Sequence, residues 1–250
     1  MTETRTAMRD DGATIAYHHT PGKSPGVMFL TGFMSDMTGG KALHLEEYCR
    51  KQGRAFLRFD YQGHGASSGA FKDGTISGWT EDAVFALDAL AEGPQILVGS
   101  SMGGWIMLLA ALQRPERVAG LLGIAAAPDF TENIIENKLT AEQKETIERD
   151  GFISMPSDYD DSPYIITKAL LEDGRNNLLL NKPIPLTCPV RLIHGVKDAD
   201  APWRTSLRIS EMLTSGDVEL TLVKEGGHRL SEPADLDRLT RNLEALIGAS

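Results

Sequence analysis

The chain has few cysteines, no cluster of basic residues and no long apolar run. Its two cysteines, Cys49 and Cys188, show no metal-ligand spacing, and we expect both to be reduced thiols. Lys and Arg total 25 against 35 Asp and Glu, and they form no basic cluster of the kind that binds phosphates. These absences exclude a disulfide-stapled scaffold and argue against a nucleic-acid partner.

No apolar stretch approaches the roughly 18–20 residues that a membrane-spanning helix needs. The first residues, MTETRTAMRDDG, contain no apolar core of a secretory signal. We therefore expect a cytoplasmic protein without a membrane span. The 250 residues suffice for a substantial core, and α/β folds of this size are routinely one domain.

Short apolar segments alternate with amphipathic segments along most of the chain. Two short strands flank Asp11 and Gly12, and further strands are predicted at 26–32, 55–61, 95–100, 118–127, 189–195 and 218–224. Helical spacing predicts helices at 41–51, after Thr80, at 102–112, at 203–213 and at the end of the chain. This alternation predicts an α/β fold, with a mostly parallel twisted sheet covered by helices on both faces.

The alternation stops between about residues 129 and 186. Thr140 and Gln143 form a capping-box pattern for a helix through Arg149, and Pro163 is placed to start another helix through about Leu171. We interpret residues 129–186 as a helical cap inserted into a core made of residues 1–128 and 187–250. Such an insertion would cover the carboxyl edge of the sheet.

The strongest functional signal is the segment QILVGSSMGGWIMLLA, from Gln95. It contains a G-x-S-x-G pattern between an apolar strand and an apolar helix, which is typical of a nucleophile elbow. Only Ser101 has glycine two residues away on both sides, at Gly99 and Gly103; Ser100 does not. We therefore predict Ser101 as a catalytic nucleophile, held in a strained turn with its hydroxyl exposed.

A serine hydroxyl needs a base to remove its proton, and the sequence offers six histidines. His228 lies in a glycine-containing loop between the last predicted strand and the last helix, where a catalytic histidine is expected. We predict structural or surface roles for the other five, namely His18, His19, His44, His64 and His194.

The acid that orients the histidine should follow a strand between Ser101 and His228. The segment HGVKDADAP offers Asp198 and Asp200. Asp198 is favoured because it comes first after the strand, whereas Asp200 is placed to cap the helix that begins near Pro202. Asp200 remains the alternative acid.

Acyl transfer also needs donors for a developing oxyanion. The backbone N–H of Met102 is one predicted donor, since Met102 follows the nucleophile at the start of a helix. The N–H of Phe33 is the other, because Phe33 lies in the loop TGFMSDMTGG after an early strand.

Five segments of the chain resemble the α/β-hydrolase superfamily, in the order Ser, Asp, His. More narrowly, the chain resembles the branch of mitochondrial abhydrolase-domain enzymes, acyl-protein thioesterases that also cleave acyl glucuronides, and their bacterial relatives. The segments are GFMSDMTGGKA from Gly32, RFDYQGHGASSG from Arg58, GSSMGGW from Gly99, CPVRLIHGVKDADAPW from Cys188 and GGHRLSEPADL from Gly226.

We therefore predict a serine hydrolase that cleaves ester or thioester bonds of small to medium acyl substrates through an acyl-enzyme, with no cofactor and no metal. The same triad could serve acyl transfer, C–C hydrolysis or perhydrolysis, and the same fold could serve as a ligand receptor. Apolar residues of the cap and near the elbow could line an acyl pocket, and the candidates are Met34, Trp105, Phe152, Tyr164 and Trp203.

The cap also carries acidic residues, and we expect them to form a solvated surface. If they faced the entrance to the site, they would disfavour anionic leaving groups. These residues are Asp158, Asp160, Asp161, Glu172 and Asp173.

Overall fold

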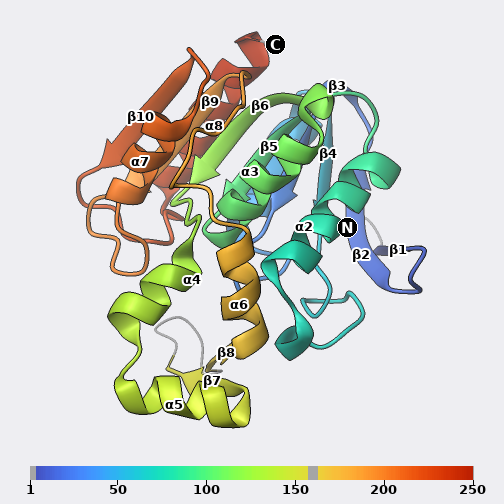
Figure 1. Ribbon diagram of the computed structural model, residues 1–250. Helices are drawn as coiled ribbons and strands as arrows, with labels where there is room; N and C mark the ends of the chain where they lie inside the picture. The colour runs from blue at the N-terminus through green and yellow to red at the C-terminus, as the bar shows by residue number, and fades with distance from the viewer. Residues whose placement is uncertain (1–3, 157–162, 250) are drawn as a thin grey trace.

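An eight-stranded sheet runs through the centre of the computed structural model, which describes residues 4–156 and 163–249 (Figure 1). The strand order is β1-β2-β4-β3-β5-β6-β9-β10. Neighbours from β4 to β10 pair in parallel, and β2 is antiparallel to both β1 and β4. The strands are β1 (Arg5–Met8), β2 (Thr14–Thr20), β3 (Lys23–Leu30), β4 (Arg54–Phe59), β5 (Gln95–Ser100), β6 (Val118–Ile124), β9 (Val190–Gly195) and β10 (Val218–Val223).

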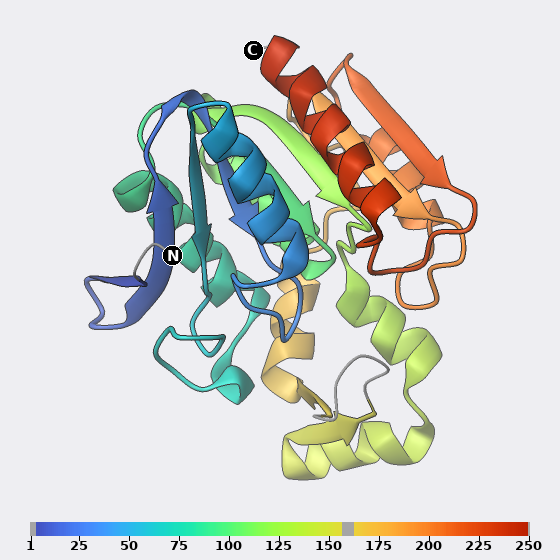
Figure 2. The ribbon, with the colours of Figure 1, turned by 180° about the vertical axis from the view of Figure 1, so that it is seen from behind.

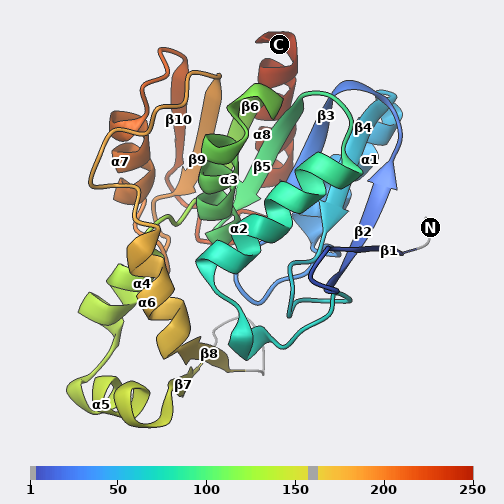
Figure 3. The same ribbon diagram turned by 45° about the vertical axis from the view of Figure 1, so that its right-hand side comes forward.

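Helices cover both faces of this sheet, so that central strands such as β5 are buried along their whole length. One face carries α2, α3 and α7, and the view from behind shows α1 and α8 on the other (Figures 1 and 2). The turned view in Figure 3 separates the two helical layers. The helices are α1 (Gly40–Lys51), α2 (Ile76–Phe85), α3 (Met102–Gln113), α7 (Arg204–Met212) and α8 (Pro233–Ala249). The predicted α/β class is confirmed.

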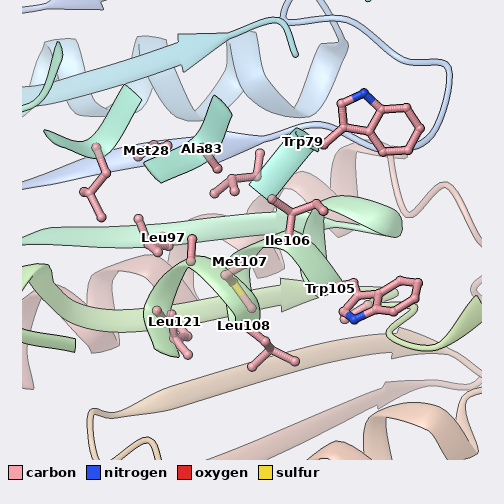
Figure 4. Packing of buried hydrophobic residues seen from close by; sticks show 14 of the residues in the cluster. Met28, Trp79, Ala83, Leu97, Trp105, Ile106, Met107, Leu108 and Leu121 are labelled. Carbon is pink, nitrogen blue, oxygen red and sulfur yellow. The ribbon is translucent and has the colours of Figure 1, made fainter. Parts of the chain in front are cut away.

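Each face of the sheet has its own apolar cluster. In the larger one, side chains of α2 and α3 meet those of the central strands, as Figure 4 shows for Trp79, Ala83, Trp105, Ile106, Met107, Leu108, Met28, Leu97 and Leu121. The other cluster joins the opposite face of the sheet to Leu45 of α1 and to Leu239 and Leu243 of α8. Burial of each such large side chain contributes about 1.5–3 kcal/mol, which holds the strand ends in fixed positions.

Helix α2 begins earlier than the sequence pattern predicts. Thr75 is its N-cap and accepts a hydrogen bond from the Gly78 N–H at 3.1 Å. Thr80, the predicted cap, lies inside the helix and donates its hydroxyl proton to the Ile76 carbonyl. Short helical turns complete the connections at Phe71–Asp73, Ala86–Leu90 and Pro115–Arg117.

The cap segment is the predicted insertion, residues 129–186, and its described parts, 129–156 and 163–186, lie at the end of the sheet where β5 and β6 finish (Figure 1). It contains α4 (Phe130–Asn133), a turn at Ile134–Lys138, α5 (Ala141–Asp150), β7 (Phe152–Met155), β8 (Tyr164–Thr167) and α6 (Lys168–Asn176). The capping box of Thr140 and Gln143 at α5 is confirmed. The prediction that a helix starts at Pro163 is wrong. Strand β8 follows Pro163 and pairs with β7, and helix α6 begins only at Lys168. The division into core and cap stays an interpretation.

Polar contacts attach the cap segment to the rest of the chain. The carboxylate of Asp173 accepts hydrogen bonds from the Ser77 N–H at 2.8 Å and from the Ser77 hydroxyl at 2.7 Å, at the start of α2. The Trp105 indole N–H donates to the Asn177 carbonyl at 3.1 Å. These bonds set where the cap lies over the end of the sheet. Of the helices in the two described ranges, none has the length and apolar character to cross a membrane.

Candidate active site

Ser101 occupies the sharp turn between β5 and α3. Its backbone angles are φ 56° and ψ −121°, a conformation that is strained for a residue with a side chain. A Cβ atom added at Gly99 would overlap the backbone of Gly103, and one added at Gly103 would overlap the carbonyl of Leu30. The glycines two residues on either side are therefore required by close backbone approach, as the G-x-S-x-G pattern predicts.

The side chains of Ser101, His228 and Asp198 form one hydrogen-bonded chain. His228 Nε2 lies 2.9 Å from Ser101 Oγ, and His228 Nδ1 lies 2.7 Å from Asp198 Oδ2. These distances are those of good hydrogen bonds, and Ser101 and His228 are 127 residues apart in the sequence. The structure brings together the three residues predicted as a catalytic triad.

Of the two candidate acids, Asp198 contacts the histidine ring. Its Oδ1 accepts hydrogen bonds from the N–H groups of Asp200 and Ala201, both at 2.9 Å. Asp200 forms a salt bridge at 3.5 Å with Lys138 of the cap segment. The capping role predicted for Asp200 is not the observed one, because α7 starts after Trp203 without a side-chain cap.

A second histidine also reaches Asp198. His194 Nε2 lies 3.0 Å from Asp198 Oδ2, and both side chains are 0% exposed. Burial alone would raise the pKa of the Asp198 carboxyl, but hydrogen bonds from His194 and His228 outweigh burial and hold that pKa well below its usual range. The contact of His194 was missed in the sequence, although its spacing of four residues from Asp198, at a strand end, was a usable signal.

The two predicted oxyanion donors lie beside the nucleophile. A Cβ added at Gly32 would lie 3.4 Å from Ser101 Cβ, so the loop carrying Phe33 packs directly against the elbow. Phe33 and Met102 line the same cavity as Ser101. Within residues 4–156 and 163–249, neither backbone N–H donates a hydrogen bond, which leaves both available to an oxyanion.

A cavity of about 460 Å³ opens at Ser101 and His228, between the elbow and the cap segment. Two of the predicted pocket residues, Met34 and Tyr164, line it. Further apolar lining side chains come mainly from the cap segment and the Phe33 loop, and these are Phe33, Phe130, Ile134, Met155 and Ile166. The Phe33 ring packs against the ring of Tyr164, with centroids 5.8 Å apart, and so joins the loop to the cap.

The other three predicted pocket residues lie elsewhere. Trp105 is fully buried in the core beneath the elbow, because its indole faces α6 instead of the cavity. Phe152 is 49% exposed on another surface of the cap segment. Trp203 stacks against the Arg204 guanidinium, 4.5 Å from the ring centroid. The sequence placed these residues near the site, but their side chains do not line the cavity.

Where the structure describes them, the acidic residues of the cap do not line the cavity. Glu172 and Asp173 do not line the cavity, since Asp173 binds Ser77 and Glu172 lies near Lys168 on the surface. Asp158, Asp160 and Asp161 lie outside the described residues. The charged residues that line the cavity are of both signs, namely Asp36, Lys41, Lys138, Asp200 and Arg229.

Lys41 is a half-buried charged residue of the cavity lining. Its ammonium group donates a hydrogen bond at 2.5 Å to the carbonyl of Arg229, the residue that follows His228 in the sequence. Burial and the neighbouring Arg229 lower its pKa to about 8.

One group of side chains has the spacing of possible metal ligands. Oxygen and nitrogen atoms of Asp198, Asp200 and His228 lie within 4.8 Å of one another. Asp198 and His228 already form a hydrogen bond with each other, and four hydrogen-bond donors surround the Asp198 carboxylate.

Cys49 and Cys188 are both free thiols, as the sequence predicts.

A family model described as Serine aminopeptidase, S33 (Hydrolase_4) matches residues 26–146. The chain is similar to palmitoyl-protein thioesterase ABHD10, mitochondrial, of Pongo abelii, with 44% identity over 240 residues that cover 96% of this chain and 78% of the relative. The Homo sapiens protein of the same name is 43% identical over the same shares.

Two solved structures are similar over nearly the whole chain. Alpha/beta hydrolase domain-containing protein 10 from mouse has a TM-score of 0.92 and 41% identity, and 99% of each chain is covered. A hydrolase of Agrobacterium vitis S4 has the same score and identity, with 98% of each chain covered. The expected cytoplasmic location is wrong by this comparison, because the curated relatives are named as mitochondrial proteins.

Proposed function

Because this chain belongs to the ABHD10 family of α/β-hydrolases and is a hydrolase of ester or thioester bonds, we propose that it acts through a catalytic triad. The three residues of that triad are Ser101, His228 and Asp198. We propose further that it removes medium to long acyl chains from thiols by way of an acyl-enzyme. The observation that carries both proposals is the hydrogen-bonded chain of the three side chains at the mouth of a cavity with an apolar wall.

The geometry suits acyl transfer by a serine. His228 Nε2 takes the Ser101 proton as Oγ attacks the acyl carbonyl carbon, and Asp198 orients the ring through Nδ1 and stabilises its cation. The N–H groups of Phe33 and Met102 stabilise the negative charge on the carbonyl oxygen. The leaving thiol or alcohol takes the proton from His228. A water then gives a proton to His228 as it attacks the acyl carbonyl carbon, and the bond to Ser101 Oγ breaks as Oγ takes that proton back, which releases the acid.

The cavity wall divides the substrate between two chemical environments. Apolar side chains of the cap and the Phe33 loop would hold the acyl chain, and each buried methylene adds about 0.8 kcal/mol until the space is full. Charged and polar side chains, including Lys41 and Arg229, line the part of the cavity near the His228 loop. This arrangement supports an acyl group on the cap side and a polar leaving group on the other side. Charged side chains of both signs line the cavity, so its described wall does not exclude anionic leaving groups.

The first test concerns the nucleophile. Ser101→Ala should keep the fold and lose roughly 10⁴–10⁶ in kcat on an acyl thioester, because the attacking oxygen is removed. Ser100→Ala is the matched control, since Ser100 also lines the cavity, whereas His228 Nε2 lies at hydrogen-bond distance from Ser101 Oγ. It should keep most of the activity and its labelling by a fluorophosphonate. Labelling that persists in Ser101→Ala would contradict the assignment.

The second test concerns the acyl chain. On a series of thioesters of increasing length, kcat/KM should rise with each added carbon and then level off. Ile134→Trp should shift that plateau to shorter chains, because Ile134 lines the cavity. Phe152→Trp changes the same cap segment outside this cavity and should leave the profile unchanged. A profile without length dependence in any variant would refute acyl binding in this cavity.

A further inference from the structure

His194 is fully buried at the carboxyl end of β9, four residues before Asp198. Its Nε2 atom lies 3.0 Å from Asp198 Oδ2 and 2.9 Å from the Ala201 carbonyl oxygen. Its Nδ1 atom lies 2.7 Å from the hydroxyl of Ser206, a buried residue of α7. The ring therefore links β9, the loop that carries Asp198, and the helix that follows this loop.

The partners of His194 decide which ring nitrogen carries the proton. A carboxylate and a carbonyl oxygen can only accept, so Nε2 must be the donor. The hydroxyl of Ser206 can donate to Nδ1, which leaves every polar atom of the neutral ring satisfied. Ser206 thus complements the ring form that presents an N–H to Asp198.

We infer that His194 is a positioning residue for the reaction: its Nε2–H and the two loop amides fix the Asp198 carboxylate so that Oδ2 faces His228. The inference rests on the proposed triad. Oδ1 is held by the N–H groups of Asp200 and Ala201, and Oδ2 is shared by the two histidines. Without His194, only the contact with His228 would orient Oδ2.

Sharing Oδ2 also weakens its pull on the His228 proton. The His194 N–H draws charge from the same oxygen, so less charge is available to stabilise protonated His228. Removal of the His194 donor should therefore let His228 hold its proton to higher pH. Substitution at position 194 leaves the other ionisable groups around His228 in place. These are Asp198 and Asp200 from the loop after β9, and Lys41, Lys138 and Arg229 from the cavity wall.

The deciding comparison uses His194→Leu and His194→Gln. Leucine removes the donor, whereas the glutamine amide can return an N–H near the position of Nε2. His194→Leu should lower kcat on a thioester by roughly 10–100-fold with KM unchanged, by analogy with the loss of partners that orient metal ligands. Its kcat/KM should also begin to fall at a higher pH on the acid side. His194→Gln should recover most of kcat and the wild-type pH profile.

Two further variants separate positioning from folding. His64→Gln alters another buried histidine, which forms a hydrogen bond with the Gln62 carbonyl, and it should leave kcat and the pH profile unchanged. Ser206→Ala keeps His194 but removes the partner of Nδ1, and it should lower kcat several-fold without a change in KM. This variant tests the inference even if His194→Leu does not fold.

The outcomes distinguish this inference from the proposed function. If Ser101→Ala is inactive while His194→Leu and Ser206→Ala keep the wild-type kcat and pH profile, the positioning role is wrong and the triad stands. If Ser101→Ala remains active, the triad itself is wrong. Equal losses in His194→Leu and His194→Gln would also overturn the inference, since the restored N–H would then have no effect.

Discussion

His64 shows how one buried polar side chain links stability to pH. It lies among aromatic rings, with centroids 5.0 Å from Phe71 and 5.1 Å from Trp79. Within the part of the chain that the structure describes, its Nε2 atom has no hydrogen-bond partner. Burial lowers the pKa of His64 from 6.5 to about 4. The folded protein therefore binds this proton only at a much lower pH than the unfolded chain does.

This difference predicts a loss of stability in acid. Between pH 6.5 and about pH 4 the unfolded chain binds the proton and the folded protein does not, so acid favours unfolding. The contribution of His64 to that loss is on the order of 3 kcal/mol in unfolding free energy. His64→Phe keeps the ring and removes the titration, and its unfolding free energy in urea should depend less on pH over this range. If the unfolding free energy of the variant had the same pH dependence as that of the wild type, His64 would not be a source of the acid sensitivity.

At the scale of elements, the junction of β5 and α3 depends on backbone contact more than on side chains. Gly103 lies in the first turn of α3, against the carbonyls of Leu30 and Thr31 at the end of β3. This contact lets the helix approach the sheet closely enough for Ser101 to reach the edge where His228 lies. The same glycine therefore serves both the packing of the helix and the position of the nucleophile.

Gly103→Ala should destabilise the protein, although alanine normally favours a helix by about 1 kcal/mol. The added Cβ would overlap backbone that cannot move independently, and such overpacking costs about 1–3 kcal/mol. Gly248→Ala is the matched control, because Gly248 is also helical and, among the described residues, its added Cβ would meet no atom of another element within 4 Å. Urea unfolding of both variants checks this. A stabilised Gly103→Ala would show that the contact is not tight.

At the scale of the whole molecule, the buried apolar side chains are unequally distributed. Two large clusters enclose the sheet, whereas the cap segment has a small one made of Leu139, Ile147, Ile153, Ile166 and Leu171. Local opening requires less free energy where fewer apolar contacts must be broken. The cap segment should therefore open more often than the sheet, which would admit a long acyl chain.

Hydrogen exchange followed by mass spectrometry checks this expectation. Peptide amides from α5 and β7 should exchange well before those from β5 and β6, which pair on both sides within the sheet. Exchange of the cap and the sheet at one common rate would contradict it and would indicate that both unfold only together. A non-hydrolysable acyl thioester analogue should slow exchange in the cap more than in β10, at the edge of the sheet.

Much of the fold was predictable because its signals are local. Apolar runs of strand length, helical spacing and glycines at turns are properties of neighbouring residues, and they predicted the parallel sheet and its two helical layers. The elbow at Ser101 was predictable for the same reason, since Gly99 and Gly103 lie within two residues of it. The start of α6 was missed because the pairing of β7 with β8 outweighed the helix-starting preference of Pro163.

Contacts between distant segments were decided only by the tertiary structure. The sequence left Asp198 and Asp200 as alternative acids, and the direction of each side chain on a folded loop gave one the contact with His228 and the other a salt bridge with Lys138. Trp105 is near Ser101 in sequence, yet its ring turns into the core. A pattern along the chain specifies which residues are neighbours in an element, whereas packing between elements determines which way a side chain points.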